Sequence, residues 1–341
     1  MRKVSRARGV WRVATHAASE PGKAARVSSP APIWLDDATS ARRRVPELSQ
    51  GTVVVTGNFD GVHRGHQALF VRALHEARDK DLIPVALTFD PHPRIVLGKG
   101  EPAMLTSTER RIELIRELGV AHVFVRRFDL AFAAWPAERF VEELLVGDLS
   151  ARVVVAGDNF HFGARRAGDD ALLQRMGPLL GFAAFTLEAT DEKGPLSSSR
   201  VRDAIALGDL AEAAHVLGRP HSIAGTVVHG DHRGRTIGFP TANLDEVFEM
   251  VPPNGVYAVM VDGIGPGVMN IGVRPTVHTE ARRTLEVHVF DFTGDLYGKT
   301  LRVQLIDKLR DERKFDGLPA LQAQIAADVT RARAATRGLA R

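Results

Sequence analysis

Two histidines follow an apolar run in the first quarter of the chain, in a spacing that suits phosphate chemistry. The run Thr52–Thr56 leads into a decapeptide that ends in His63-Arg64-Gly65-His66, and a helical pattern begins near Gly65. A helix start presents unpaired N–H groups and the positive end of the helix dipole to an anion. Imidazoles three residues apart can face the same phosphates. The other candidates for nucleotide binding in this segment are Gly57, Asn58, Phe59, Asp60, Gly61 and Gly65. The segment predicts a triphosphate site.

Further polar loops follow other predicted strands. Gly157–Gly163 comes directly after the apolar run Arg152–Ala156, and in it Asn159 could bond a base or ribose edge. Phe160 and Phe162 could pack against a ligand ring, with a place in the core as the alternative. In doubly wound sheets ligands gather outside the carboxyl ends of the strands. The loop Thr88–Pro93 ends another strand and is expected to face the same crevice, with a proline-stiffened turn as the alternative.

A serine-rich segment, Ser197–Arg202, precedes another predicted helix. A hydroxyl such as that of Ser199 can cap the helix, and the guanidinium of Arg202 is a fixed cation for phosphate. We therefore expect Arg202 to complete the phosphate site formed by the histidines.

The second half of the chain contains a different set of ligands. Gly230 and Gly238 lie in a glycine-rich stretch that could close over phosphates, although it is not a Walker loop. Thr241 and Asn243 are two residues apart and point the same way on an extended segment. Their neutral oxygens suit Mg²⁺ that bridges nucleotide phosphates. A Pro-Thr turn with a local Asn hydrogen bond is the alternative.

A carboxylate on a predicted strand completes this second set. Glu286 and His288 alternate with apolar residues in Thr284–Val289, so both lie on one face. A carboxylate there could accept the proton of a primary alcohol as general base. A solvated strand face is the alternative interpretation.

The elements that position these residues change type along the chain. Apolar runs expected to be strands are Thr52–Thr56, Ile83–Phe89, His122–Val125, Arg152–Ala156 and Phe182–Leu187. Helical patterns lie between them at Gln67–Lys80, Thr106–Leu118 (with Thr106 as cap) and from Pro136 to Leu145. This alternation predicts an α/β, doubly wound, Rossmann-like parallel sheet.

After Pro220 the pattern becomes β-rich. The expected strands are Ser222–Val228, Val256–Val261, Gly267–Ile271, Leu285–Phe292 and Leu301–Ile306, followed by a helix from Leu318 to about Val329. They predict an antiparallel barrel or sandwich. The predicted domains are a basic extension over 1–32, an α/β domain over 33–218 and a β domain over 219–341.

Composition narrows the class of protein. The chain has 341 residues, 44% hydrophobic content and no cysteine, which excludes disulfides and thiolate metal sites and fits a reducing cytoplasm. It has no apolar run long enough to span a membrane. The net charge of +4 is mild, and residues 1–32 hold seven Lys or Arg against one acid. We expect no nucleic-acid partner. A nucleic-acid-binding or regulatory tail is the alternative.

These motifs together resemble the bacterial bifunctional FAD synthetases, in which a riboflavin kinase is fused to an FMN adenylyltransferase. The resemblance spans roughly residues 33–338 and begins with the His63–His66 segment, Gly157–Gly163 and Ser197–Arg202. It implies ATP-phosphate binding and transition-state stabilisation by His63 and His66, with Asn159 in the nucleotide site. One departure is His161, where many relatives carry Arg.

The second half resembles the riboflavin kinase module. The matching motifs are Gly234-Arg235-x-x-Gly238-Phe-Pro-Thr-Ala-Asn243, Asn270–Thr276, Glu286-Val-His288, Asp295–Gly298 and Leu309–Phe315. The resemblance implies a six-stranded barrel with a terminal helix, nucleotide binding around Arg235, Thr241 and Asn243 at Mg-ATP, and Glu286 as catalytic base. It also implies that Arg310 and Glu312 line the flavin pocket.

The sequence therefore predicts a cytoplasmic enzyme that converts riboflavin to FMN and FMN to FAD. It would use ATP, with Mg²⁺ as cofactor and no membrane partner, as a monomer or weak homo-oligomer. Two alternatives stay open: only one half is active, or the first half acts on another substrate such as a pantetheine or choline phosphate. The latter leaves the second half unexplained.

Overall fold

The chain folds into two compact units. The computed structural model describes residues 11–12, 31–36, 40–230, 238–274 and 282–339. One unit comprises Met1–Pro102 and Thr108–Ser197, and the other comprises Ala103–Ser107 and Ser198–Arg341. The helices α8 (Ser198–Leu207) and α9 (Leu210–Leu217) thus cluster with the second unit. The predicted boundary at residue 218 stays a prediction.

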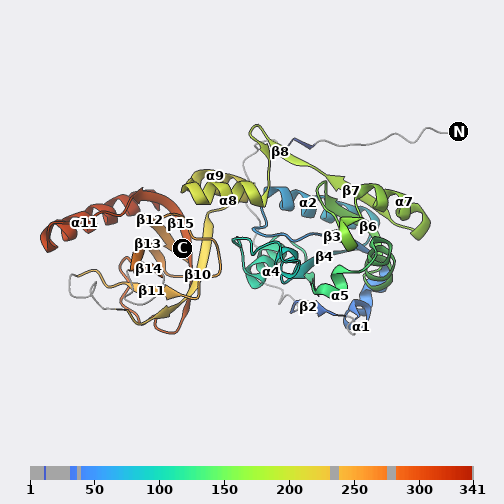
Figure 1. Cartoon of the computed structure of the whole chain (residues 1–341), viewed down its shortest axis with the longest axis horizontal. Coiled ribbons are helices and arrows are strands. Elements are labelled where there is room, and N and C mark those ends of the chain that lie inside the picture. The colour runs from blue at the N-terminus through green and yellow to red at the C-terminus, as the bar shows by residue number, and fades with distance from the viewer. Residues whose placement is uncertain (1–10, 13–30, 37–39, 231–237, 275–281, 340–341) are drawn as a thin grey trace. The chain divides into compact units, whose positions relative to one another are not determined.

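The first unit is built on a six-stranded parallel sheet (Figure 1). Its strand order is β2-β5-β4-β3-β6-β7, and every neighbouring pair is parallel. The strands are β2 (Ile33–Leu35), β3 (Thr52–Thr56), β4 (Ile83–Asp90), β5 (His122–Arg127), β6 (Ala151–Gly157) and β7 (Ala183–Leu187). The doubly wound prediction is confirmed. Only β2 among them was not expected.

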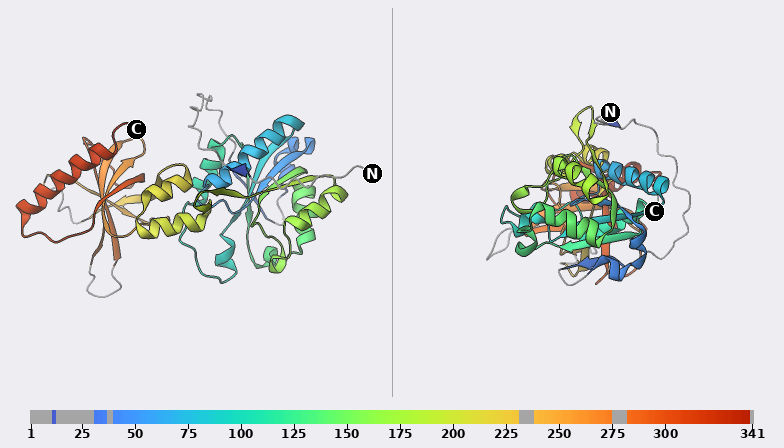
Figure 2. Two further views of the ribbon diagram at one scale, coloured as in Figure 1. Left: turned by 90° about the horizontal axis from the view of Figure 1, so that it is seen from above. Right: turned by 90° about the vertical axis from the view of Figure 1, so that its right-hand side faces the viewer.

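Helices cover both faces of this sheet (Figures 1 and 2). Successive strand residues point to opposite faces, so Val54 packs in one core and its neighbours Val53 and Val55 pack in the other. The face of Val53 and Val55 is covered by α2 (Arg64–Lys80) and α4 (Thr108–Glu117). The other face is covered by η2 (Phe140–Asp148), a π-helix, and by α7 (Asp170–Leu180).

Several helix predictions need correction. α4 begins at Thr108, two residues later than expected, and ends at Glu117, one residue before Leu118. The helix expected from Pro136 begins as α6 (Ala137–Arg139), with Pro136 as its N-cap. It then continues as η2 to Asp148, beyond the expected end at Leu145. Smaller elements of this unit are β1 (Trp11–Arg12), α1 (Ala41–Arg44), η1 (Pro46–Gln50), α3 (Pro93–Val96), α5 (Leu130–Ala133), η3 (Ala164–Arg166), β8 (Ala189–Asp191) and β9 (Gly194–Pro195).

The second unit is a closed six-stranded barrel in which every pairing is antiparallel. Its order is β10-β11-β14-β13-β12-β15, formed by β10 (His221–Val228), β11 (Ala242–Asp245), β12 (Gly255–Val261), β13 (Gly265–Arg274), β14 (Arg282–Val289) and β15 (Thr300–Arg310). Because these six strands close on themselves, the fold is a barrel and not a sandwich. The terminal helix α11 (Leu318–Ala335) runs past the expected end near Val329.

The barrel interior is filled by every second strand residue. In β14, Leu285, Val287 and Val289 belong to the barrel core, so Glu286 and His288 between them face outward. Across both units, no helix among the described residues is both long and apolar enough to span a bilayer.

Candidate active site

The two predicted histidines meet at the start of α2. His63 is the N-cap residue, and the backbone N–H of His66 donates to His63 Nδ1 at 3.3 Å. The two rings stack with centroids 3.6 Å apart. The lone pair on His63 Nδ1 thus satisfies one free N–H of the helix. Ser, Thr, Asp or Asn usually has this capping role. Any proton of a neutral His63 ring therefore lies on Nε2.

His66 is held in its neutral form. Burial lowers the pKa of His66 well below its ordinary value, and the charges of His63 and Arg111 lower this pKa further. Its ring also meets Phe59 edge-on, with centroids 5.3 Å apart. Its Nδ1 is buried and makes no hydrogen bond within the part of the chain that the structure describes. The pair therefore offers imidazole nitrogens at a helix N-terminus without an imidazolium at His66.

The loop before the histidines has a strained backbone. Phe59 and Val62 have φ of 51° and 40°, a left-handed conformation that side chains rarely adopt, least of all a β-branched one. Phe59 and Val62 are both fully buried, with Phe59 packed on Phe70. The prediction that Phe59 contacts nucleotide is corrected for its side chain, which is part of the core. Asp60 is also buried, at 2% exposed.

The glycines of the segment are explained by close approach. A Cβ on Gly65 would lie 2.7 Å from the carbonyl oxygen of Leu196, and one on Gly57 would lie 2.9 Å from the Phe59 ring. Gly61 has φ of 81°, which favours glycine. Gly65 is thus required by packing against the chain before Ser197, whatever it does for phosphate.

The loop after β6 divides its predicted residues. Asn159 is exposed, and its carbonyl oxygen accepts from His161 Nδ1 at 2.9 Å. Phe162 is buried against Phe140, with ring centroids 4.9 Å apart. Its ring therefore belongs to the core, which was the alternative to a ligand contact. Phe160 is half-buried, so its ring is the one of the two that keeps an accessible face.

Ser199 and Arg202 lie in the first two turns of α8, at a helix start as predicted. Arg202 Nε donates to the carbonyl oxygen of Ala103 at 2.7 Å. Both residues belong to the second unit, whereas His63 and His66 belong to the first. Their contribution to the same phosphate site stays a prediction.

In the barrel, three polar side chains form a row across adjacent strands. Asn243 of β11 pairs in register with Glu286 of β14, which pairs with Asn270 of β13. All three alternate with core residues and so point outward. Directly paired residues have Cβ atoms about 5 Å apart. We call Asn243, Glu286 and Asn270 the polar row. The motif Asn270–Thr276 by itself indicated no role for Asn270.

The segment that leads into β11 is held against β14. His288 Nδ1 donates to the carbonyl oxygen of Pro240 at 2.8 Å, and the Phe239 ring meets the His288 ring edge-on. Thr241 follows Pro240 and is half-buried. His288, which shares the face of Glu286 as predicted, thus places the Thr241–Asn243 segment beside the general-base candidate.

The glycines of this loop differ in environment. Gly230 packs against the Asn243 amide, because a Cβ there would lie 2.2 Å from Asn243 Nδ2. Gly238 has φ of 86° and open space around it. Arg235 lies outside the described residues.

The two predicted flavin residues of the barrel have defined partners. Arg310 pairs with Asp328 of α11, with Arg310 Nη2 and Nε each 2.9 Å from Asp328 Oδ2. Asp328 is 1% exposed, so α11 fixes the position of this guanidinium. Glu312 accepts from Asn254 Nδ2 at 3.3 Å and lies over Gly272, where a Cβ would be 2.4 Å from Glu312 Oε1.

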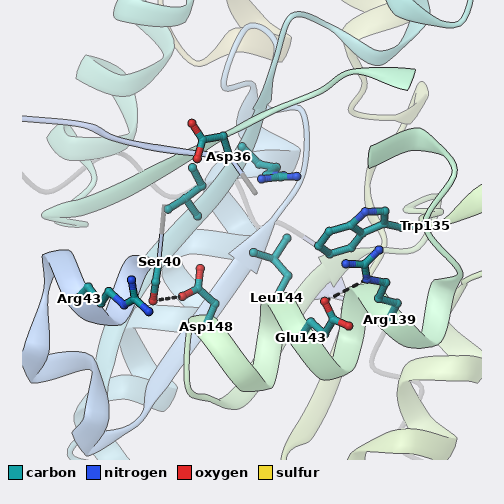
Figure 3. Close-up of a pocket in the computed structure, with 10 residues that line it drawn as sticks. Asp36, Ser40, Arg43, Trp135, Arg139, Glu143, Leu144 and Asp148 are labelled. Atoms are coloured by element: carbon teal, nitrogen blue, oxygen red, sulfur yellow. Dashed lines mark hydrogen bonds and ion pairs between the residues drawn. The ribbon is translucent and has the colours of Figure 1, made fainter. Parts of the chain in front are cut away.

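A pocket elsewhere in the first unit contains none of the predicted residues. Figure 3 shows Ser40 and Arg43 at one side and Trp135 and Arg139 at the other. Its acids are already engaged: Asp148 accepts from Ser40 Oγ at 2.7 Å, and Glu143 pairs with Arg139 at 3.0 Å. Arg139 lies over the Trp135 ring at 3.8 Å. We assign this pocket no function.

The donor set fits Mg²⁺ that is held mainly by phosphates. Among the described residues no cluster of three or more His, Cys, Asp or Glu could hold a metal. The polar row offers a carboxylate and amide oxygens, the hard ligands that Mg²⁺ prefers, and Mg²⁺ usually keeps several waters or phosphate oxygens.

Comparison with known proteins gives a consistent result. The riboflavin kinase family matches residues 217–336, and the FAD synthetase family matches residues 45–200. The bifunctional riboflavin kinase/FMN adenylyltransferase of Escherichia coli K12 is 44% identical over 85% of this chain and 96% of its own length. That of Bacillus subtilis is 37% identical over 85% of this chain and 94% of its own.

A solved structure matches most of this chain. A crystal structure described as a macrolide-efflux protein from Streptococcus pneumoniae has a TM-score of 0.75 and 34% identity, over 83% of this chain and 94% of that one. Together with the parallel sheet and the closed barrel, these matches show that the chain belongs to the bifunctional riboflavin kinase/FMN adenylyltransferase family and is an enzyme of FAD biosynthesis.

Proposed function

We propose that the two reactions are divided between the two units. The barrel phosphorylates riboflavin with ATP to give FMN and ADP, and the parallel-sheet unit transfers AMP from a second ATP to FMN, releasing pyrophosphate. The observation that supports this division most directly is the polar row. It contains a carboxylate, Glu286, between two amides, Asn243 and Asn270, in the unit that does not contain His63 and His66.

In AMP transfer an FMN phosphate oxygen attacks the α-phosphorus of ATP, and the bond to the β-phosphate breaks. FMN phosphate is already ionised, so no protein nucleophile or base is needed. Negative charge grows on the α-phosphate and the departing pyrophosphate. His63 Nε2, the neutral His66 ring and the N-terminus of α2 provide donors and positive potential for it. Arg202, Ser199 and Asn159 are proposed as nucleotide-binding residues, and Phe160 as a flavin-binding residue.

In the kinase reaction the 5′-hydroxyl of riboflavin attacks the γ-phosphorus. The hydroxyl proton passes to Glu286, the new O–P bond forms, and ADP leaves. Glu286 is half-buried on the outer face of β14, where a ligand can reach it. Arg310 and Glu312 are proposed to contact the flavin, with Arg310 held by Asp328.

Mg²⁺ is the proposed cofactor of both reactions and would neutralise phosphate charge when bound. In the barrel Thr241 and Asn243 are proposed to hold it together with nucleotide phosphates. The pairing of Asn243 with Glu286 across neighbouring strands supports this proposal. Gly230, Arg235 and Gly238 are proposed to border the nucleotide.

The remaining proposals concern context. We propose a cytoplasmic enzyme with no nucleic-acid partner, acting as a monomer or weak homo-oligomer. The domain limits at 32 and 218 are likewise proposed. Residues 1–10 and 13–30, where a nucleic-acid-binding tail was the alternative, lie outside the described residues.

One time course tests the function. The full chain is incubated with riboflavin, Mg²⁺ and excess ATP, and FMN and FAD are resolved by chromatography. We expect FMN first and then FAD, and FAD alone when FMN is supplied. Accumulation of FMN without FAD, or FAD from supplied FMN with no product from riboflavin, would show that only one unit is active. Addition of EDTA is expected to stop both steps.

A further inference from the structure

A buried arginine outside the predicted site ties the carboxyl ends of two sheet strands together. Arg111 lies on α4 and is 1% exposed. Its Nη1 donates to the carbonyl oxygen of Asn58 at 2.8 Å, in the loop after β3. Its Nη2 donates to the carbonyl oxygen of Phe89 at 3.2 Å, near the end of β4. One planar guanidinium therefore links the loop after β3 to the carboxyl end of β4, the edge of a parallel sheet where ligands gather.

The first of these contacts acts directly on the strained backbone. Asn58 precedes Phe59, whose φ is 51°, and its carbonyl oxygen also accepts from Thr88 Oγ1 at 3.2 Å. A left-handed non-glycine residue persists only where its surroundings over-determine it. The same turn then leads through Val62 to His63, the cap of α2. Arg111 thus constrains the backbone that sets the position of both imidazoles.

The guanidinium is itself held in place. Arg111 Nη2 donates to Thr108 Oγ1 at 2.9 Å and lies 3.8 Å from Asp90 Oδ1. Burial lowers the pKa of Arg111, and the charges of Asp60, Asp90 and Glu109 oppose this by favouring its cationic form. Burying a cation costs free energy of hydration, and the hydrogen bonds and acidic neighbours of Arg111 compensate for part of that cost.

We propose that Arg111 is a positioning residue for AMP transfer, which aligns His63 and His66 by clamping the Asn58 and Phe89 carbonyl groups. This inference rests on the proposed function of the first unit. Arg111 acts through the backbone and touches no substrate. Its loss should therefore misplace donors that stabilise the transition state more than it weakens ATP binding. A displacement of about 1 Å from the reacting geometry can cost about 100-fold in rate.

The test compares three variants in both assays. Arg111→Met keeps the length of the side chain but removes charge and donors, and Arg111→Lys keeps the charge but cannot form the planar fork. Arg110→Met is the matched control, because Arg110 lies on the same helix, is also largely buried (side chain 15% exposed) and pairs with Glu113 and Glu117 of its own helix. Steady-state kinetics of FAD formation from FMN are measured, with FMN formation from riboflavin as the internal reference.

We expect kcat for FAD formation to fall about 100-fold in Arg111→Met and about 10-fold in Arg111→Lys, with the KM for ATP within about threefold of wild type. Arg110→Met should match wild type, and the kinase rate should stay within about twofold throughout. Tryptophan fluorescence reports folding of the first unit, because Trp11, Trp34 and Trp135 all belong to it.

Several outcomes would overturn the inference. They are a near wild-type kcat in Arg111→Met, a loss confined to the KM for ATP, and full activity in Arg111→Lys when Arg111→Met is unfolded. The last would show a purely structural cation. A wild-type protein that makes no FAD from FMN would instead refute the proposed function, whatever the variants do.

Discussion

The two units present their reactive groups on different structural supports. In the first, His63 and His66 sit at the junction of a buried parallel strand and a helix, over a loop with left-handed residues and a buried arginine. In the second, Asn243, Glu286 and Asn270 occupy the outer face of regular antiparallel strands. The first support has a strained backbone and points free N–H groups in one direction. The second has regular strands, and the pairing register of these strands sets which side chains are neighbours.

This difference follows from the chemistry proposed for each unit. AMP transfer needs oriented donors and no base, and a helix N-terminus provides them. The kinase needs a base beside phosphate ligands, and period-two alternation places such residues side by side without any special backbone. If the two supports are independent in stability and catalysis, a substitution in one unit should leave the reaction of the other unchanged.

The largest expected effect is on the kinase. Glu286→Gln should lower FMN formation by about 1,000-fold, because it removes the proposed general base. FAD formation from supplied FMN should not change, as measured by chromatography. Glu246→Gln, an exposed position at the end of β11, is the control and should retain both rates. Loss of both reactions in a folded Glu286→Gln protein would contradict independent sites.

The barrel should also lose stability in acid through His221. This side chain is 2% exposed, its Nε2 donates to the Met250 carbonyl oxygen at 2.7 Å, and burial lowers its pKa to about 4. The unfolded chain binds the proton near pH 6.5. Stability is thus fully present above pH 6.5 and falls as pH drops toward 4, by about 3 kcal/mol in all.

Urea unfolding followed through tyrosine isolates this effect, because Tyr257 and Tyr297 are the only tyrosines and both lie in the barrel unit. His221→Leu should be less stable at pH 7 but should flatten the tyrosine-monitored dependence between pH 6.5 and 4. An unchanged slope would show that other groups carry the dependence. His66, whose pKa is also lowered, should give the first unit a slope of the same sign.

The cap and the imidazole of His63 can be separated. His63→Asn keeps an oxygen able to cap α2, whereas His63→Ala does not. We expect both to lower FAD formation by about 100-fold with the kinase intact, and only His63→Ala to lose about 1 kcal/mol of stability by tryptophan-monitored unfolding. The control is His75→Asn, exposed on the same helix. Activity retained in His63→Asn would limit His63 to capping.

The smallest expected effect is on flavin affinity. Asp328→Asn removes the carboxylate that holds Arg310, although Arg310 keeps its bond to the Asp311 carbonyl oxygen at 3.0 Å. The KM for riboflavin should rise about 10-fold, because an ordered guanidinium is replaced by one that must be fixed on binding. FAD formation should be unaffected. A wild-type KM for riboflavin would separate Arg310 from the flavin pocket.

The sequence by itself determined the fold class, most elements and the family. Alternating apolar runs and helical periodicity report local burial, and this is enough to place β3, β4 and five of the six barrel strands, whereas the short β11 was not expected as a strand. The pairing of His63 with His66 and the outward face of Glu286 also follow from spacing alone, since each depends on residues two or three apart.

Only the tertiary structure decided what depends on distant contacts. Arg111 in α4 reads as one more basic residue, yet it bonds Asn58, which is 53 positions away. Phe59 and Phe162 look like ligand contacts in sequence but are buried in the two cores. Likewise, Asn270 becomes a site candidate only because strand pairing puts it beside Glu286. Asp328 becomes one only because α11 packs on the barrel and brings it to Arg310. Local pattern cannot encode these contacts, because closure of a sheet or barrel joins segments that are far apart along the chain.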